Sequence, residues 1–163
     1  MIKIIISITV IIISALCGNE FYKQKREKVM AIQELSRIVE NIIISIDYLS
    51  LDVYEICKRV FINRNHLDYS SFMDIESGDF PLMWENACKA SLSEIPFNIR
   101  NKFIEIGSFI GACDSESQIK KLEYIKDELQ KSYEEYYDKL NREKKLHSTV
   151  SICIGILTVL IVI

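Results

Sequence analysis

Residues 110–129, IGACDSESQIKKLEYIKDEL, decide the fold class of this chain. Gly111 is expected to end one helix, because glycine favours the position just after a helix. Ser115 and Gln118 have the S-x-x-Q spacing of a capping box, with Asp114 just ahead, so Asp114 or Ser115 is expected to cap the next helix. Beyond the box, apolar residues recur every three or four positions, which is the period of an amphipathic helix. No proline lies in the rest of the chain, so this final helix is expected to be long.

The preceding residues also read as helices joined by short turns. A first apolar face runs from Val29 to Ile46 and breaks at residues 50–52. Four helices are expected after it: one capped by Asp52, a short one stopped by Gly78, one starting at Asp79–Pro81, and one between Pro96 and Gly111. The third is expected to present Leu82, Met83, Trp84, Ala87 and Ala90 to the core. The five glycines and two prolines are too few for an all-β sandwich.

Two uncharged apolar runs flank the charged middle of the chain. They are IIISITVIIISALCG at residues 4–18 and VSICIGILTVLIVI at residues 150–163. A bilayer needs about 20 apolar residues, so both runs are short, but local thinning can accommodate them. The first run fits an uncleaved anchor better than a signal peptide, because Ala15 and Cys17 match a cleavage site poorly. The expected fold is an all-α, compact bundle of about six helices, flanked by one short transmembrane helix at each end.

The expected organisation is an N-terminal anchor at residues 1–18, a helical domain at residues 19–147 and a C-terminal anchor at residues 148–163. Residues 19–37 hold five basic and three acidic residues, and residues 139–149 hold four basic and one acidic. Because cytoplasmic flanks of membrane segments are enriched in Lys and Arg, the domain is expected to face the cytoplasm. The alternative is a signal-anchored helical adaptor or sensor outside the cell.

Charge and cysteine content narrow the function classes. The net charge is −3, and no basic patch with interleaved aromatic residues occurs, so nucleic-acid binding is not expected. The five cysteines are odd in number and lack C-x-x-C spacing, which argues against a disulfide framework or a zinc site.

No motif for catalysis or cofactor binding is present. The sequence lacks the phosphate-binding loop, the dinucleotide fingerprint, the nucleophile elbow and the H-E-x-x-H zinc motif. His66 is expected to be a lone exposed histidine, and His147 lies at the predicted membrane boundary. We therefore expect no catalytic residue, no cofactor, no metal and no small-molecule substrate. The remaining functions are scaffolding, docking and assembly.

Several short elements together resemble one family. Residues 110–118 follow the pattern L-G-x-x-D-x-x-x-Q, with Gly111, Asp114 and Gln118 in place and Ile110 at the leucine position. Trp84 matches a tryptophan-containing helix. The other matches are Gly18 and Glu20 after the N-terminal run, Lys25 and Arg26 in the basic segment, and Ile46 and Tyr48 as an I-x-Y element.

On these elements, and over nearly its whole length, the chain resembles the stage III sporulation protein AB family of endospore-forming bacteria. It departs from the family at residues 146–148, where Leu, His and Ser stand in place of frequent glycines. The resemblance implies a cell-membrane protein on the mother-cell side, in a transenvelope complex between mother cell and forespore. It implies a soluble domain similar to the helical cytoplasmic domains of type II secretion F proteins.

The resemblance also implies partners and candidate residues. The implied partners are the stage III sporulation ATPase, protein AA, and the other membrane subunits of the same complex. The candidate residues are Gly18, Glu20, Trp84, Gly111, Asp114 and Gln118. For the element from Gly111 to Gln118 two interpretations stay open, a structural turn and a partner contact.

Overall fold

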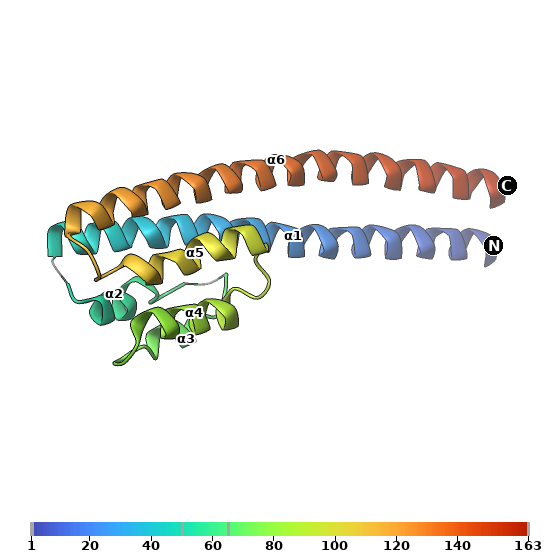
Figure 1. Ribbon diagram of the computed structural model, residues 1–163. Helices are drawn as coiled ribbons and strands as arrows, with labels where there is room; N and C mark the ends of the chain where they lie inside the picture. Colours follow the sequence, from blue (N-terminus) through green and yellow to red (C-terminus); the bar gives the residue numbers. More distant parts are fainter. Residues whose placement is uncertain (1, 50, 65, 163) are drawn as a thin grey trace. The chain divides into compact units, whose positions relative to one another are not determined.

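Two long helices, α1 (Ile2–Leu49) and α6 (Ser115–Val162), begin and end the chain in the computed structural model (Figure 1). Between them come α2 (Val53–Val60), α3 (Ser70–Met73), α4 (Phe80–Ser91) and α5 (Phe97–Phe109). The structure describes the backbone of residues 2–49, 51–64 and 66–162, and within these the side chains of all but residues 2–19, 21, 145–149 and 151–162. Over the described backbone there are six helices and no strand, which confirms the predicted all-α bundle.

The chain forms two compact units, residues 28–134 and residues 1–27 with 135–163. In the second unit, Lys25 Nζ lies 2.5 Å from Glu143 Oε2. The Lys144 ammonium lies 5.1 Å from the centre of the Tyr22 ring, within cation–π range. These two contacts hold α1 and α6 side by side within this unit (Figure 1).

The predicted anchors, at residues 1–18 and 148–163, fall outside the residues whose side chains are described, apart from Val150. Across the part of the chain that is described, no helix includes a stretch long and apolar enough to cross a membrane. The two transmembrane anchors, and the domain limits drawn from them, therefore stay predictions.

In the unit of residues 28–134, α1 supplies one continuous apolar face. Its fully covered residues are Val29, Ala31, Ile32, Leu35, Ile38, Val39, Ile42 and Ile46. The spacing of three and four along α1 puts them on one side of the helix. The face predicted from Val29 to Ile46 is confirmed, except that Ile43 is only partly buried.

An aromatic cluster fills the space between α2, α3, α4 and α5. Phe61 stacks on Phe72 with ring centres 4.3 Å apart, and Trp84 meets Phe72 edge-on at 5.0 Å. Trp84 also stacks on Phe103 of α5 at 5.4 Å. Offset-stacked and edge-on pairs are the favoured aromatic geometries. Tyr69 and Phe80 lie at the margin of the cluster.

Three helices begin at aspartates whose carboxylates accept backbone N–H groups. Asp52 accepts from Tyr54 at 3.1 Å, and Asp79 accepts from Leu82 at 3.4 Å. These two caps are confirmed, and they satisfy donors that a helix start leaves unpaired. At α6, Asp114 accepts from the N–H of Ser117 at 2.9 Å. Asp114, one of the two caps predicted for this helix, is therefore the N-cap. The predicted capping box of Ser115 and Gln118 is wrong, because Ser115 is the first helical residue.

Two details of the central helices also differ from prediction. The short helix α3 ends at Met73 and not at Gly78, because the chain turns inward to bury Ile75. Gly78, with φ of +124°, belongs to the turn before the Asp79 cap. In α4 the core face is formed by Phe80, Trp84, Ala87 and Cys88. Leu82 and Ala90 are exposed, since they lie on the opposite side of this helix.

Candidate interaction surface

The turn between α5 and α6 is braced by one buried glutamine. Gln118 Oε1 accepts from the N–H of Gly111 at 2.9 Å, and its Nε2 donates to the carbonyl of Cys113 at 2.5 Å. Gly111 has φ of +74°, which glycine adopts without strain. A Cβ on Gly111 would lie 2.7 Å from Cγ1 of Val53 at the start of α2. The turn is thus closed by hydrogen bonds and packed against α2.

Asp114 is exposed at the end of this turn. The backbone N–H of Ser117 lowers the pKa of its carboxyl group, and the Ser117 hydroxyl adds to the effect. The carboxylate therefore stays ionised at neutral pH. Its hydrogen bond to α6 is a structural contact, and whether it also touches a partner stays a prediction.

Trp84 is fully covered by the aromatic cluster and by α5. Its indole N–H donates to the carbonyl of Phe103 at 2.9 Å. Gly107 lies directly against the ring, so that a Cβ there would be 2.5 Å from Trp84 Cδ1 and 2.8 Å from its Cβ. Trp84 therefore joins α4 to α5 and presents no surface to a partner.

Two other candidate residues lie on α1. The surroundings of Gly18 lie outside what the structure describes, so nothing further follows for it. Glu20 is exposed on α1, in the unit that contains residues 1–27. Gly18 and Glu20 belong to the unit of residues 1–27 with 135–163, whereas the turn from Gly111 to Gln118 belongs to the unit of residues 28–134.

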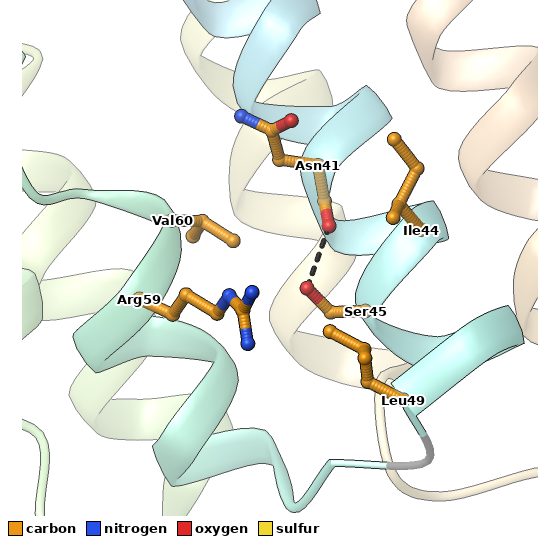
Figure 2. Close-up of a pocket in the computed structure, with 6 residues that line it drawn as sticks. All are labelled: Asn41, Ile44, Ser45, Leu49, Arg59 and Val60. Atoms are coloured by element: carbon orange, nitrogen blue, oxygen red, sulfur yellow. Dashed lines mark hydrogen bonds between the residues drawn. The ribbon is translucent and has the colours of Figure 1, made fainter.

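The surface of α1 and α2 carries an open hollow, shown in Figure 2. Its volume is about 220 Å³, and it lies between the end of α1 and the end of α2. The guanidinium of Arg59 points into it toward Ser45 and Leu49 (Figure 2). The Ser45 hydroxyl donates to the Asn41 carbonyl at 2.7 Å. The lining residues are Asn41, Ile44, Ser45, Leu49, Arg59 and Val60.

A second hollow adjoins the first along α2, because Arg59 lines both. Its volume is about 430 Å³, and its other lining residues are Leu51, Glu55, Lys58 and Ile62. We call the two hollows together the Arg59 groove. Large exposed apolar side chains gather around it, namely Ile44, Tyr48, Leu49 and Ile62.

A third hollow, of about 260 Å³, lies between α5 and α6 beside the exposed Tyr124. Its two cations already have contacts within the chain. Lys120 pairs with Glu116 at 2.7 Å, and the Lys121 ammonium lies 5.1 Å from the centre of the Phe109 ring. This hollow therefore offers less unmet charge than the Arg59 groove.

Reactive chemistry has little support in the described residues. Burial raises the pKa of the Cys57 thiol to about 12 and raises that of the Cys88 thiol, so both stay neutral and poorly nucleophilic. No cluster of three or more His, Cys, Asp or Glu side chains suited to a metal occurs among the residues described.

One polar group links α1 to the loop before α3. Glu34 accepts from the backbone N–H of His66 at 3.3 Å and from the Tyr69 hydroxyl at 3.2 Å. Burial, followed by the Glu34 charge, raises the pKa of Tyr69. His66 is only partly exposed, so the prediction of a lone exposed histidine is wrong. Its N–H and the Tyr69 hydroxyl hold this loop against α1.

Two features of the site were not identified from the sequence. Gly107 lies inside a helix and has no local role there, so its contact with Trp84 appears only in the fold. The Arg59 groove depends on how α2 folds back beside α1, which no local motif encodes. Its apolar rim does leave a trace, because Ile44 and Tyr48 lie two positions after the core residues Ile42 and Ile46.

Comparison with known proteins gives one match. The family model described as stage III sporulation protein AB matches residues 3–163. Searches of curated protein sequences and of solved structures gave no match.

Proposed function

We propose that this chain, which belongs to the stage III sporulation protein AB family, is a membrane-anchored platform subunit that docks a cytoplasmic ATPase. The family is a stage III sporulation protein, so the chain's role is in sporulation. In this proposal the two apolar ends hold the protein in the mother-cell membrane. The helical unit of residues 28–134 assembles the ATPase with the other membrane subunits of a complex between mother cell and forespore.

The observation that carries the proposal is the apolar surface around the Arg59 groove. Monomeric proteins rarely expose contiguous apolar patches unless a partner covers them. Here Ile44, Leu49 and Ile62 remain exposed beside a tightly packed aromatic core. The pairing of a rigid core with an uncovered apolar surface is typical of a binding module. The basic flanks on both sides of the helical domain favour a cytoplasmic location for it, where an ATPase could reach it.

Membrane topology tests the proposal first. Lys131 lies on the exposed side of α6, where its side chain is 70% accessible, so Lys131→Cys provides a reporter thiol. Cys17, Cys113 and Cys153 are replaced by serine, whereas Cys57 and Cys88 can remain because they are buried. The chain with only these two buried thiols is the control, and it should react only after denaturation.

Sporulating cells that carry Lys131→Cys are treated with a membrane-impermeant thiol reagent, both intact and after permeabilisation. Labelling only after permeabilisation is the expected result. The full-length chain should then retain the stage III sporulation ATPase, protein AA, in a pull-down. Labelling of intact cells would place the domain outside and overturn ATPase docking in favour of an extracytoplasmic adaptor or sensor.

A further inference from the structure

We propose that the Arg59 groove is the docking site for an amphipathic helix of a partner protein, which brings apolar side chains to the rim and a carboxylate to Arg59. This inference rests on the proposed platform function and deepens it. It names the surface that binds and the chemistry of the segment that is bound.

The rim of the Arg59 groove is apolar. Tyr48, on α1, is 78% exposed, and Ile62, in the turn after α2, is 54% exposed. Ile44 and Leu49 line the first hollow and are also exposed. Contact with a partner would remove these four side chains from water, which is the favourable term in most protein association. They come from a single stretch of chain, residues 44–62, so one ligand segment can cover them together.

Arg59 places a positive charge inside the groove. Its guanidinium points into the groove and lines both hollows (Figure 2). Within the described part of the chain Arg59 has no ion pair, whereas its neighbour Lys58 pairs with Glu76 at 3.3 Å. A guanidinium recognises a carboxylate through two parallel N–H donors, and contact with a partner would strengthen this pair by excluding water. The partner is therefore expected to place Asp or Glu at the centre of its bound face.

The exposed side of α1 extends this pattern. Arg37, Asn41, Ile44 and Tyr48 are spaced by four, three and four residues, so they form one stripe along the helix. Arg37 also has no ion pair among the residues described. Along the stripe the order is a cation, an amide and two apolar side chains. A bound helix lying along it would carry a second acidic residue near Arg37 and apolar residues near Tyr48.

A helix fits this surface better than other occupants. No strand edge exists in the described residues, so an added β-strand would have no pairing partner. Both hollows are open to solvent, whereas a small-molecule site encloses most of the surface of its ligand. The exposed side of α1 and the end of α2, with the open groove between them, are the kind of surface into which an amphipathic helix inserts its apolar face.

The test is site-specific photo-crosslinking of the full-length chain in sporulating cells. A photoreactive p-benzoylphenylalanine replaces Tyr48, and the crosslinked peptide is identified by mass spectrometry. The same probe at Leu82 is the control, because Leu82 is 54% exposed on α4, away from the groove. We expect the Tyr48 probe to capture a segment of another protein with helical apolar spacing and an acidic residue on the same face.

Two matched pairs of variants test the chemistry. Arg59→Glu should reduce the crosslink at least tenfold, whereas Lys89→Glu on the exposed side of α4 should leave it unchanged. Ile62→Asp should reduce it similarly, whereas Leu82→Asp, at equal exposure, should not. Replacing the captured acidic residue with arginine should restore the crosslink to the Arg59→Glu chain, because the charge pair is then reversed.

Other outcomes would overturn the inference. Capture of a second copy of this chain, of lipid, or of a segment without an acidic residue would each remove the proposed occupant, and so would equal yields from Tyr48 and Leu82. If the Arg59→Glu chain still retains the ATPase while the crosslink is lost, ATPase docking stands and uses another surface. If the unaltered chain captures an acidic helix but never retains the ATPase, the groove inference stands and the platform function fails.

Discussion

The contact between Gly107 and Trp84 gives the sharpest stability prediction, for the variant Gly107→Ala. The added Cβ would lie 2.8 Å from the Cβ of Trp84, as well as 2.5 Å from its ring. The ring could turn away only by leaving its hydrogen bond with Phe103. The Trp84 Cβ cannot turn away, because the backbone of α4 fixes it. The two helices must therefore move apart by about half an ångström to reach ordinary contact.

The magnitude follows from three opposing effects. Alanine gains about 1 kcal/mol over glycine in a helix interior. Overpacking a tight core costs about 1–3 kcal/mol. Displacing the indole would leave a buried N–H unpaired, at about 1–3 kcal/mol. The expected net loss is about 1–5 kcal/mol of unfolding free energy.

Urea unfolding of the full-length chain measures this loss, followed by the fluorescence of Trp84, which is the only tryptophan. With a slope near 1.5 kcal/mol per molar urea, the midpoint should fall by about 2 M. Ser108→Ala is the control, because Ser108 is exposed on the same helix and its change should stay within about 0.5 kcal/mol. A Gly107→Ala chain as stable as the unaltered one would refute the packing argument.

Three further predictions concern the turn between α5 and α6. Gln118→Ala should lower the unfolding free energy by about 1–3 kcal/mol, because the Gly111 N–H and the Cys113 carbonyl lose their hydrogen-bond partner. The exposed control Gln130→Ala should change it little, and equal effects of the two variants in urea unfolding would contradict the prediction. Gly111→Ala should lower the unfolding free energy by about 1–2 kcal/mol because of the φ of +74°, and by more because the new Cβ would meet Val53. In a Val53→Ala background this loss should therefore be smaller. An equal loss in both backgrounds would show that the contact with Val53 is unimportant. Asp114→Asn should keep the cap but lose the pH dependence of stability that comes from the carboxylate. Because folding lowers the pKa of Asp114, its charge contributes stability above the unfolded pKa, near 4, and this contribution disappears as pH falls through the folded pKa. The unfolding free energies of the two chains, measured from pH 7 to pH 3, should therefore converge, and a constant difference would exclude Asp114 as the source.

Helix starts were predictable because their signals are local. Asp52 and Asp79 each cap a helix through an N–H two or three residues ahead, so the sequence window contains the whole interaction. The start of α6 was ambiguous by one residue, because Asp114 and Ser115 are both good caps. The hydrogen bonds of the Gln118 side chain distinguish between these two candidate caps. This side chain bonds to Gly111, seven residues earlier, and to Cys113, so it closes the preceding turn and does not complete a capping box.

Gly107 shows why part of the core could not be predicted. A glycine inside a helix is unfavourable by itself, so a local analysis finds only its cost. Its benefit comes from Trp84, which is 23 positions earlier in the chain and on another helix. The position of Trp84 against α5 depends in turn on the aromatic cluster with Phe72 and Phe103. Such a pairing is a property of helix packing, and only the folded chain displays it.

The Arg59 groove could be predicted from the sequence only in part. In an α-helix, residues two positions apart point about 200° away from each other. Ile44 must therefore face away from the core if Ile42 faces into it, and Tyr48 must do so if Ile46 does. Residues 42–48 therefore carry apolar side chains on two opposite sides of α1, and the outward side is the one that we propose a partner covers. What the sequence could not show is Arg59, which reaches that surface only because the turn after Leu49 folds α2 back beside α1. The charge at the centre of the groove, and with it the acidic chemistry expected of the partner, is thus a consequence of the fold.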